Sequence, residues 1–184
     1  LYCGASVDFV DIDPRTGNMD VEALRSKLID ADRVGPVPKV IVPVHFAGQP
    51  TEQELIWDLA QHYGFKILED ASHAIGASRQ GEAVGNCRWS DIVVFSFHPV
   101  KIITTGEGGM ALTNDPVLAE RMATLRLHGI TRDPELFVHA PPPHRSLPPW
   151  YYEQQMLGYN YRMTDIHAAL GTSQLQRLEE YVVR

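Results

Sequence analysis

The sequence has 184 residues, of which 44% are hydrophobic and 21% are charged. A chain of this length and composition can bury a core without disulfides, which excludes disorder and collagen-like repetition. Sixteen Lys and Arg against 23 Asp and Glu give a net charge of -7, which argues against a general affinity for nucleic acid or anionic membranes. An anionic ligand would therefore need a local site.

The apolar runs are short, and the longest, residues 40–44 and 92–97, fall far below the roughly 20 residues of a membrane-spanning helix. Cys3 and Cys87 are far apart and form no CxxC pattern, so we expect neither a zinc site nor a disulfide, and a reducing cytoplasm is the expected compartment. The chain opens at Leu1 without a charged leader, and its last helical pattern has no stop signal. We therefore expect a piece of a longer chain.

The first half of the chain predicts strands that alternate with helices. β-branched and aromatic residues predict a strand over 6–12, and Asp20 is a candidate cap for the helix that follows. The continuous apolar run 39–45 is typical of a strand buried on both faces of a parallel sheet.

A second helix and a further strand complete a βαβ unit. Thr51 and Glu54 predict a capping box at the start of that helix, and Gly64 is placed to end it in a left-handed conformation. The short apolar run 65–70 predicts the next strand. Residues 40–70 therefore predict two parallel strands joined by a helix.

The second half continues the alternation. Strands are predicted over 91–97 and 109–113, and Asp115 and Pro116 predict the start of a helix that Gly129 ends. Two further segments follow. Residues 131–149 are rich in proline and predict an extended loop, and 164–184 predict one more helix.

This alternation predicts an α/β domain with a mostly parallel sheet. Ligands of such sheets bind at the carboxyl ends of the strands, so the residues that follow each strand are candidates for a site. Three side chains with reactive chemistry occupy such positions: Asp70, Ser96 and Lys101.

Lys101 is the lysine best placed for chemistry. It lies in an apolar stretch that ends in the glycines of Thr105–Gly109, where desolvation would lower the pKa of an amine and favour the neutral nucleophile. A lysine that condenses with a carbonyl needs such a setting. The alternative is a surface lysine whose aliphatic stem packs on a neighbour.

The other candidates also have structural alternatives. Asp70 has two interpretations: a cap of the next turn, or a carboxylate that pairs with a pyridine nitrogen and keeps it protonated. His73 is placed to stack on such a ring or to bond its hydroxyl, and Ser96 offers a hydroxyl to a phosphate, or simply to the backbone.

Metal and nucleotide-hydrolysis chemistry are disfavoured. His45, His73 and His98 lie near three different strands and have no second ligand at i+2 or i+4, so no metal-binding spacing results. The glycine-rich turn 106–109 lacks the GK[ST] ending of a phosphate-binding Walker loop.

Several segments together, in this order, resemble the DegT/StrS type of sugar-nucleotide aminotransferase. The segments are Val10–Asp13, Pro43–Pro50, Glu69–Ala74, Phe95–Lys101, Thr105–Gly109 and Leu157–Ile166. Within that family, Ser96–Lys101, Gly129–Pro134 and Pro149–Gln155 together look most like the transaminases of the pseudaminic acid pathway.

The resemblance implies pyridoxal phosphate as the cofactor. It implies a three-layer large domain with helices on both faces of the sheet, of which residues 1–184 are the central part, without the family's N-terminal segment and C-terminal small domain. Lys101 would join covalently to the cofactor, with Asp70 at the pyridine nitrogen, His73 near the ring and Ser96 at the phosphate. Asn160 matches a position that reaches the neighbouring subunit's site, which implies a homodimer with shared active sites.

The resemblance also implies the reaction. An amino group would pass from L-glutamate to the C4 ketone of a UDP-linked 4-keto-6-deoxy-N-acetylhexosamine, in the biosynthesis of bacterial surface amino sugars. Because the family's flanking segments are absent, the isolated chain would bind the cofactor poorly. Two alternatives stay open: a noncatalytic relative that binds a nucleotide sugar or regulates a partner, and a pyridoxal-dependent sugar dehydratase. Relatives with His in place of the lysine are dehydratases, so Lys101 argues against that variety.

Overall fold

The computed structural model describes residues 1–139 and 147–183. The chain divides into two compact units. The first joins residues 1–114 to 165–184, and the second consists of residues 115–164.

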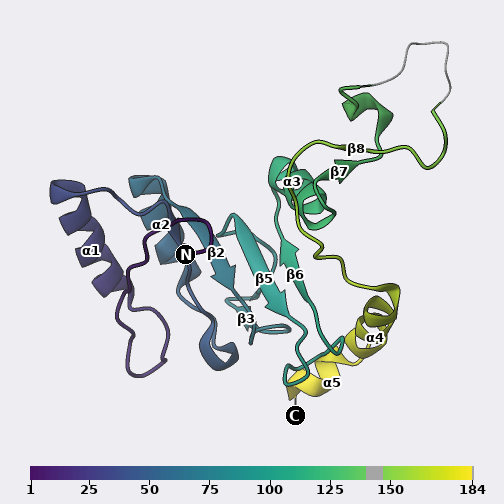
Figure 1. The fold of residues 1–184 in the computed structure, drawn as a ribbon. Coiled ribbons are helices and arrows are strands. Elements are labelled where there is room, and N and C mark those ends of the chain that lie inside the picture. Colours follow the sequence, from purple (N-terminus) through teal and green to yellow (C-terminus); the bar gives the residue numbers. More distant parts are fainter. Residues whose placement is uncertain (140–146, 184) are drawn as a thin grey trace. The chain divides into compact units, whose positions relative to one another are not determined.

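The first unit is built on a four-stranded sheet (Figure 1). Its strands, in spatial order, are β1 (Val40–Ile41), β2 (Lys66–Asp70), β5 (Ile92–Ser96) and β6 (Gly109–Leu112). Strands β1, β2 and β5 run parallel, whereas β6 is antiparallel to β5. This confirms the α/β class with a mostly parallel sheet, and the passage from β1 through α2 (Gln53–Tyr63) to β2 confirms the βαβ unit.

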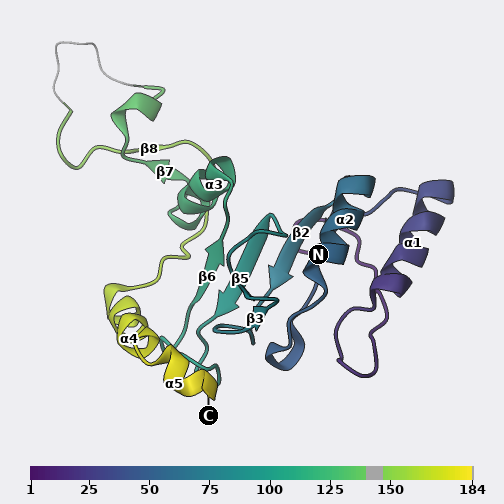
Figure 2. The ribbon, with the colours of Figure 1, turned by 180° about the vertical axis from the view of Figure 1, so that it is seen from behind.

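Helices α1 (Val21–Val34) and α2 form the core with β1 and β2. Figure 2 shows these two helices on the same side of β2. Nine buried residues make up this cluster: Val21, Leu24, Leu28, Ile41, Ile56, Leu59, Ala60, Phe65 and Ile67. Val40, Val42 and Val44 alternate with buried residues and stay 50%, 46% and 41% exposed. We call the sheet face that they share the open face. A second helical layer over it stays a prediction.

The predicted helix caps that depend on local chemistry are confirmed. The Asp20 carboxylate accepts the N–H groups of Glu22 and Ala23 at 2.8 and 3.0 Å. Asp115 caps α3 (Pro116–Arg126) in the same way, with Pro116 in the first turn. Gly64 ends α2 in the left-handed conformation, at φ 79°.

The predicted capping box is wrong. The cap residue of α2 is Glu52, which makes no side-chain cap hydrogen bond. Thr51 is engaged elsewhere: its N–H donates to His45 Nδ1 at 3.0 Å, and its hydroxyl donates to Gln53 Oε1 at 2.5 Å. Thr51, which the sequence pattern assigns to the cap of the helix, therefore bonds to the buried His45 ring and does not cap α2.

Two predicted strands are absent or shorter. Residues 6–12 form no strand, and only Ile12 makes a β-bridge, with Met19. The run 39–45 is reduced to β1 and an isolated parallel bridge between Val44 and Asp70. Pro43 lies in the gap, where it has no N–H to donate to the ladder.

The last two helices also differ from expectation. Helix α3 ends at Arg126, ahead of Gly129. The single helix predicted over 164–184 is divided into α4 (Asp165–Leu175) and α5 (Leu178–Val183). The Arg177 N–H bonds to the Gln174 carbonyl in a tighter, three-residue turn, which separates the two helices.

The described parts of the predicted loop contain short regular elements. η2 (Pro134–Leu136) is one turn of 3-10 helix within the loop, and β7 (Ile130–Thr131) lies at its start. Strand β7 pairs with β8 (Glu153–Gln154), which follows the loop. The three prolines at 141–143 lie outside the described residues.

In the first unit, β3 (Ser78–Arg79) and β4 (Glu82–Ala83) form a small hairpin. None of the helices within 1–139 and 147–183 is long and apolar enough to cross a membrane.

A buried carboxylate organises the second unit. Glu153 accepts the N–H of Val138 at 2.7 Å, the N–H of His139 at 3.0 Å and the Tyr151 hydroxyl at 2.9 Å. Burial opposes the charge, but these hydrogen bonds outweigh it and hold the pKa of Glu153 below its ordinary value. The ionised form of Glu153 therefore stabilises this arrangement.

We expect acid to loosen the second unit through Glu153. Because its pKa is lower in the folded state, the stabilisation is complete above the unfolded pKa of about 4.3 and is lost as the pH falls through the folded value. Hydrogen exchange of residues 134–139, corrected for the intrinsic rate, should accelerate over that acid range. In Glu153→Gln, the amides of residues 134–139 should exchange fast at all pH values. In Glu135→Gln, which changes an exposed glutamate of the same unit, the exchange rates should match those of wild type. An unchanged acid transition in Glu153→Gln would contradict the assignment.

Candidate active site

Asp70 and Ser96 lie at one edge of the sheet, on one face. They are the last residues of the parallel strands β2 and β5, whose carboxyl ends meet at the same edge (Figure 1). Asp70 is opposite Val94, and Ser96 is two residues further along β5, so the alternation of side chains places both on the open face. The topology therefore brings these two predicted residues together.

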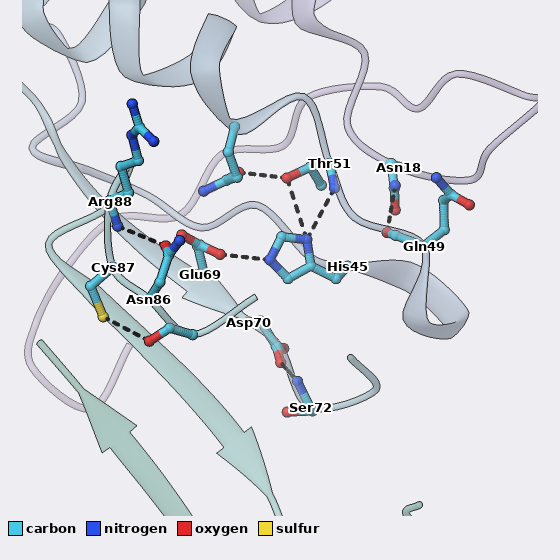
Figure 3. Close-up of polar contacts among 12 residues, drawn as sticks. Asn18, His45, Gln49, Thr51, Glu69, Asp70, Ser72, Asn86, Cys87 and Arg88 are labelled. Atoms are coloured by element: carbon cyan, nitrogen blue, oxygen red, sulfur yellow. Dashed lines mark hydrogen bonds and ion pairs between the residues drawn. The ribbon is translucent and has the colours of Figure 1, made fainter. Parts of the chain in front are cut away.

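The Asp70 carboxylate is half-buried and only partly engaged. Its Oδ1 accepts the N–H of Ser72 at 3.0 Å (Figure 3). Its Oδ2 has no hydrogen-bond partner in the described part of the chain. Asp70 thus caps the following turn, as one interpretation expected, and keeps an oxygen for a further group.

His73 follows β2 by three residues and exposes its ring. Its Nδ1 accepts the N–H of Ala47 at 3.3 Å, and its ring centroid lies 6.4 Å from that of Phe46. The ring is therefore tied on one side to the turn that follows β1 and is accessible on the other.

The Ser96 hydroxyl keeps its proton for a ligand. Its Oγ accepts the N–H of His98 at 3.3 Å, which uses only a lone pair. Gly109 lies opposite Ser96 on β6 and presents no side chain over it. Both features suit a hydroxyl that donates to an anion.

Lys101 lies near the tip of a closed loop between β5 and β6. The Phe97 carbonyl accepts the N–H of Thr105 at 3.0 Å and the hydroxyl of Thr104 at 2.9 Å, and these bonds close the loop at its base. Within the loop, the Lys101 N–H donates to the His98 carbonyl at 3.0 Å. The lysine side chain is half-buried, and no ion pair of its amine occurs among the described residues.

Helix α4 anchors this loop. The Gln174 side-chain oxygen accepts the Thr104 N–H at 2.8 Å, across 70 residues of sequence. Sequence reasoning missed Gln174, because no local pattern links it to Lys101.

We expect Gln174→Ala to loosen the Lys101 loop. The Thr104 N–H loses its acceptor, which costs about 1 kcal/mol, and hydrogen exchange of residues 98–105 should accelerate several-fold. Gln174→Glu keeps an acceptor oxygen and should restore protection. Gln176→Ala is the matched control, since Gln176 is exposed in the turn that follows α4. Equal exchange in all three variants would show that Gln174 is not an anchor.

Asn160 belongs to the second unit. It is exposed, forms a β-bridge with Leu127, and accepts a hydrogen bond from Arg162 at 3.3 Å. The other four candidates lie in the first unit. The part of Asn160 in the site therefore stays a prediction.

A buried histidine and glutamate lie on the opposite face from Asp70. The His45 ring is 0% exposed, and its Nε2 lies 2.7 Å from Glu69 Oε2 (Figure 3). A cavity of about 30 Å³ adjoins them, and Gln53 is one of its lining residues. The Nε2 atom of Gln53 is buried and has no partner among the described residues. Such a space holds a water molecule and is too small for a cofactor. Sequence reasoning considered His45 only as a metal ligand.

The side chains at the carboxyl edge suit pyridoxal phosphate. Asp70 offers an unpaired carboxylate oxygen for a protonated ring nitrogen, and His73 an accessible aromatic ring. Ser96 offers a hydroxyl proton for a phosphate, and Lys101 an amine for an aldehyde. An α/β fold with this set at one sheet edge defines the class of pyridoxal-phosphate-dependent transferases.

The chain belongs to the DegT/DnrJ/EryC1/StrS aminotransferase family, whose model matches residues 1–184. It is 39% identical over 181 residues to a GDP-perosamine synthase of Caulobacter vibrioides, a match covering 98% of this chain and 42% of that protein. It is 37% identical over 180 residues to a UDP-4-amino-4,6-dideoxy-N-acetyl-beta-L-altrosamine transaminase of Campylobacter jejuni, covering 97% and 42%.

Solved structures show the same fold. Helicobacter pylori PseC, an aminotransferase of pseudaminic acid biosynthesis, matches with a TM-score of 0.80 and 32% identity over 97% of this chain and 42% of that one. Spr1654 of Streptococcus pneumoniae, in its pyridoxamine phosphate form, matches with a TM-score of 0.76 and 28% identity, covering 97% of this chain and 46% of that one. The chain spans about two-fifths of the length of these relatives. The predicted family and fold are confirmed.

Proposed function

We propose that the full-length protein is a pyridoxal-phosphate-dependent aminotransferase that acts on a nucleotide-linked keto sugar. The observation that carries the proposal is the shared face of Asp70 and Ser96 at the sheet edge where the Lys101 loop begins. We further propose that residues 1–184 form the central part of the large domain.

The roles of the residues follow from their chemistry. Bound pyridoxal phosphate would supply an aldehyde and an electron-withdrawing ring. The free oxygen of Asp70 would hold a proton on the ring nitrogen, and Ser96 would donate its hydroxyl proton to the phosphate. Lys101 Nζ would take the proton from Cα of the amino donor and later return one to the sugar carbon that gains the amine.

The substrates belong to the same proposal. L-glutamate would be the amino donor. A UDP-linked 4-keto-6-deoxy-N-acetylhexosamine would be the acceptor, because the Campylobacter relative is named as the transaminase of a UDP-linked 4-amino-4,6-dideoxy-N-acetyl sugar. The likeness to a GDP-perosamine synthase makes a GDP-linked sugar the second candidate. A homodimer in which Asn160 reaches the partner's site would complete the enzyme.

The test is a substrate panel with the full-length protein. L-glutamate is combined with UDP-, GDP- and dTDP-linked 4-keto-6-deoxy sugars, and the products are analysed by mass spectrometry. We expect an amino sugar and an equal amount of 2-oxoglutarate from the UDP-linked substrate. Ammonia release without amine gain would identify a dehydratase, and failure to bind the cofactor would favour a noncatalytic relative.

A further inference from the structure

The turn after β1 is held against His73. It is the single turn η1 (Phe46–Gly48), in which Ala47 has a left-handed φ of 51°. Gly48, at φ 84°, packs so closely that a Cβ there would lie 3.0 Å from the His73 carbonyl oxygen. Ala47 in the same turn donates its N–H to His73 Nδ1 at 3.3 Å. Backbone contacts thus fix the position of the turn relative to the ring.

One buried asparagine spans this turn. Asn18 is 5% exposed, and its Oδ1 accepts the Phe46 N–H at 2.9 Å. Its Nδ2 donates to the Gln49 carbonyl at 2.9 Å, as Figure 3 shows. A single amide side chain therefore binds the backbone before and after Ala47, which restricts the direction of the Ala47 N–H.

A second support lies just before the turn. His45 Nδ1 accepts the Thr51 N–H, so that nitrogen carries no proton. His45 Nε2 must then carry it and donate to Glu69 at 2.7 Å. His45 is thus a neutral ring whose two bonds tie the start of the turn to β2 and to the start of α2.

The same argument applies to His73. A backbone N–H can only donate, so Nδ1 of His73 must present its lone pair to Ala47. The proton of the neutral ring then lies on Nε2, which has no hydrogen-bond partner among the described residues. His73 therefore faces outward as a hydrogen-bond donor.

We propose that Ala47, held by Asn18 and His45, fixes His73 in the tautomer protonated at Nε2, so that His73 donates to an anionic oxygen of the bound cofactor. Asn18 and His45 are positioning residues in this scheme, since they act through the turn. The proposal rests on the proposed function for the identity of the acceptor. The tautomer itself depends only on the contacts within this chain.

The tautomer is tested on full-length protein without cofactor. Ring nitrogens of ¹⁵N-histidine-labelled protein are observed well above the ordinary histidine pKa of about 6.5, and His73 is assigned from the signals missing in His73→Gln. We expect Nδ1 of His73 at the downfield shift of an unprotonated nitrogen and Nε2 at the shift of an N–H. A His73 signal protonated at Nδ1, or averaged between the two forms, would overturn the proposal.

Asn18→Ala tests the support. The variant should shift His73 toward a mixture of tautomers. Asn114→Ala is the matched control, because Asn114 donates to the carbonyls of Asn86 and Cys87 elsewhere in the same unit and should leave His73 as in wild type. An unchanged His73 spectrum in a folded Asn18→Ala variant would overturn the role of Asn18. The tautomer of His73 itself is determined from the wild-type spectrum alone.

Cofactor affinity tests the donor. The amide nitrogen of Gln reaches the region of His Nε2, whereas that of Asn does not, so His73→Gln should bind pyridoxal phosphate about tenfold more tightly than His73→Asn. Equal affinities would overturn the donor role. If wild type shows the expected tautomer but binds no cofactor, the proposed function fails and the tautomer assignment stands. If wild type binds the cofactor but shows the other tautomer, the tautomer assignment fails and the proposed function stands.

Discussion

Lys101→Ala is expected to abolish covalent capture of pyridoxal phosphate and to lower the rate of transamination by at least about a thousandfold. The variant lacks both the amine that joins the aldehyde and the base that moves the proton, and general acid–base catalysis alone contributes about 10²–10⁴-fold. Capture is measured on full-length protein by borohydride reduction and mass mapping of the modified peptide. The label should fall on the peptide that contains Lys101.

Two matched variants separate chemistry from charge. Lys101→Arg keeps the positive charge but cannot form the covalent bond, so it should be as inactive as Lys101→Ala. Lys39→Ala removes an exposed lysine and should behave as wild type. Borohydride labelling at another lysine, or a normal rate in Lys101→Ala, would refute the assignment.

Asp70→Asn should lower the rate of transamination by about 10²–10³-fold, the usual cost of removing one electrostatic stabiliser of a transition state. The asparagine oxygen can still accept the Ser72 N–H, so the turn after β2 should persist. What is lost is the charge that keeps the ring nitrogen protonated. The measurements are the turnover rate and the absorbance spectrum of the bound cofactor.

Asp58→Asn is the control for net charge, since Asp58 is exposed on α2. It should leave both the rate and the spectrum unchanged. An Asp70→Asn variant with normal rate and normal spectrum would reduce Asp70 to a turn cap.

Sequence reasoning succeeded where the determining contacts are local. Asp20 and Asp115 cap their helices through N–H groups two and three residues away, and a pattern of neighbours captures such bonds. The same holds for Gly64, whose left-handed conformation ends α2. The positions of Asp70 and Ser96 at the edge of the sheet were predictable because each ends an apolar run of strand length.

It failed where distant residues compete. Thr51 fits a capping box, but the ring of His45 takes its N–H. Residues 6–12 have strand-forming side chains, yet a strand needs a partner along its length, and only Ile12 finds one. Gln174 and Asn18 act on Thr104 and Gln49 across 70 and 31 residues, distances over which no sequence period carries information.

The open face carries a consequence for handling the molecule. Val40, Val42 and Val44 present a strip of half-exposed aliphatic surface at the edge strand, which is the kind of surface that recruits other chains. The purified 184-residue polypeptide is therefore expected to bind fluorescent dyes that report exposed hydrophobic surface, and to self-associate as its concentration rises. Val42→Lys should diminish both effects while the helical core on the other side stays intact.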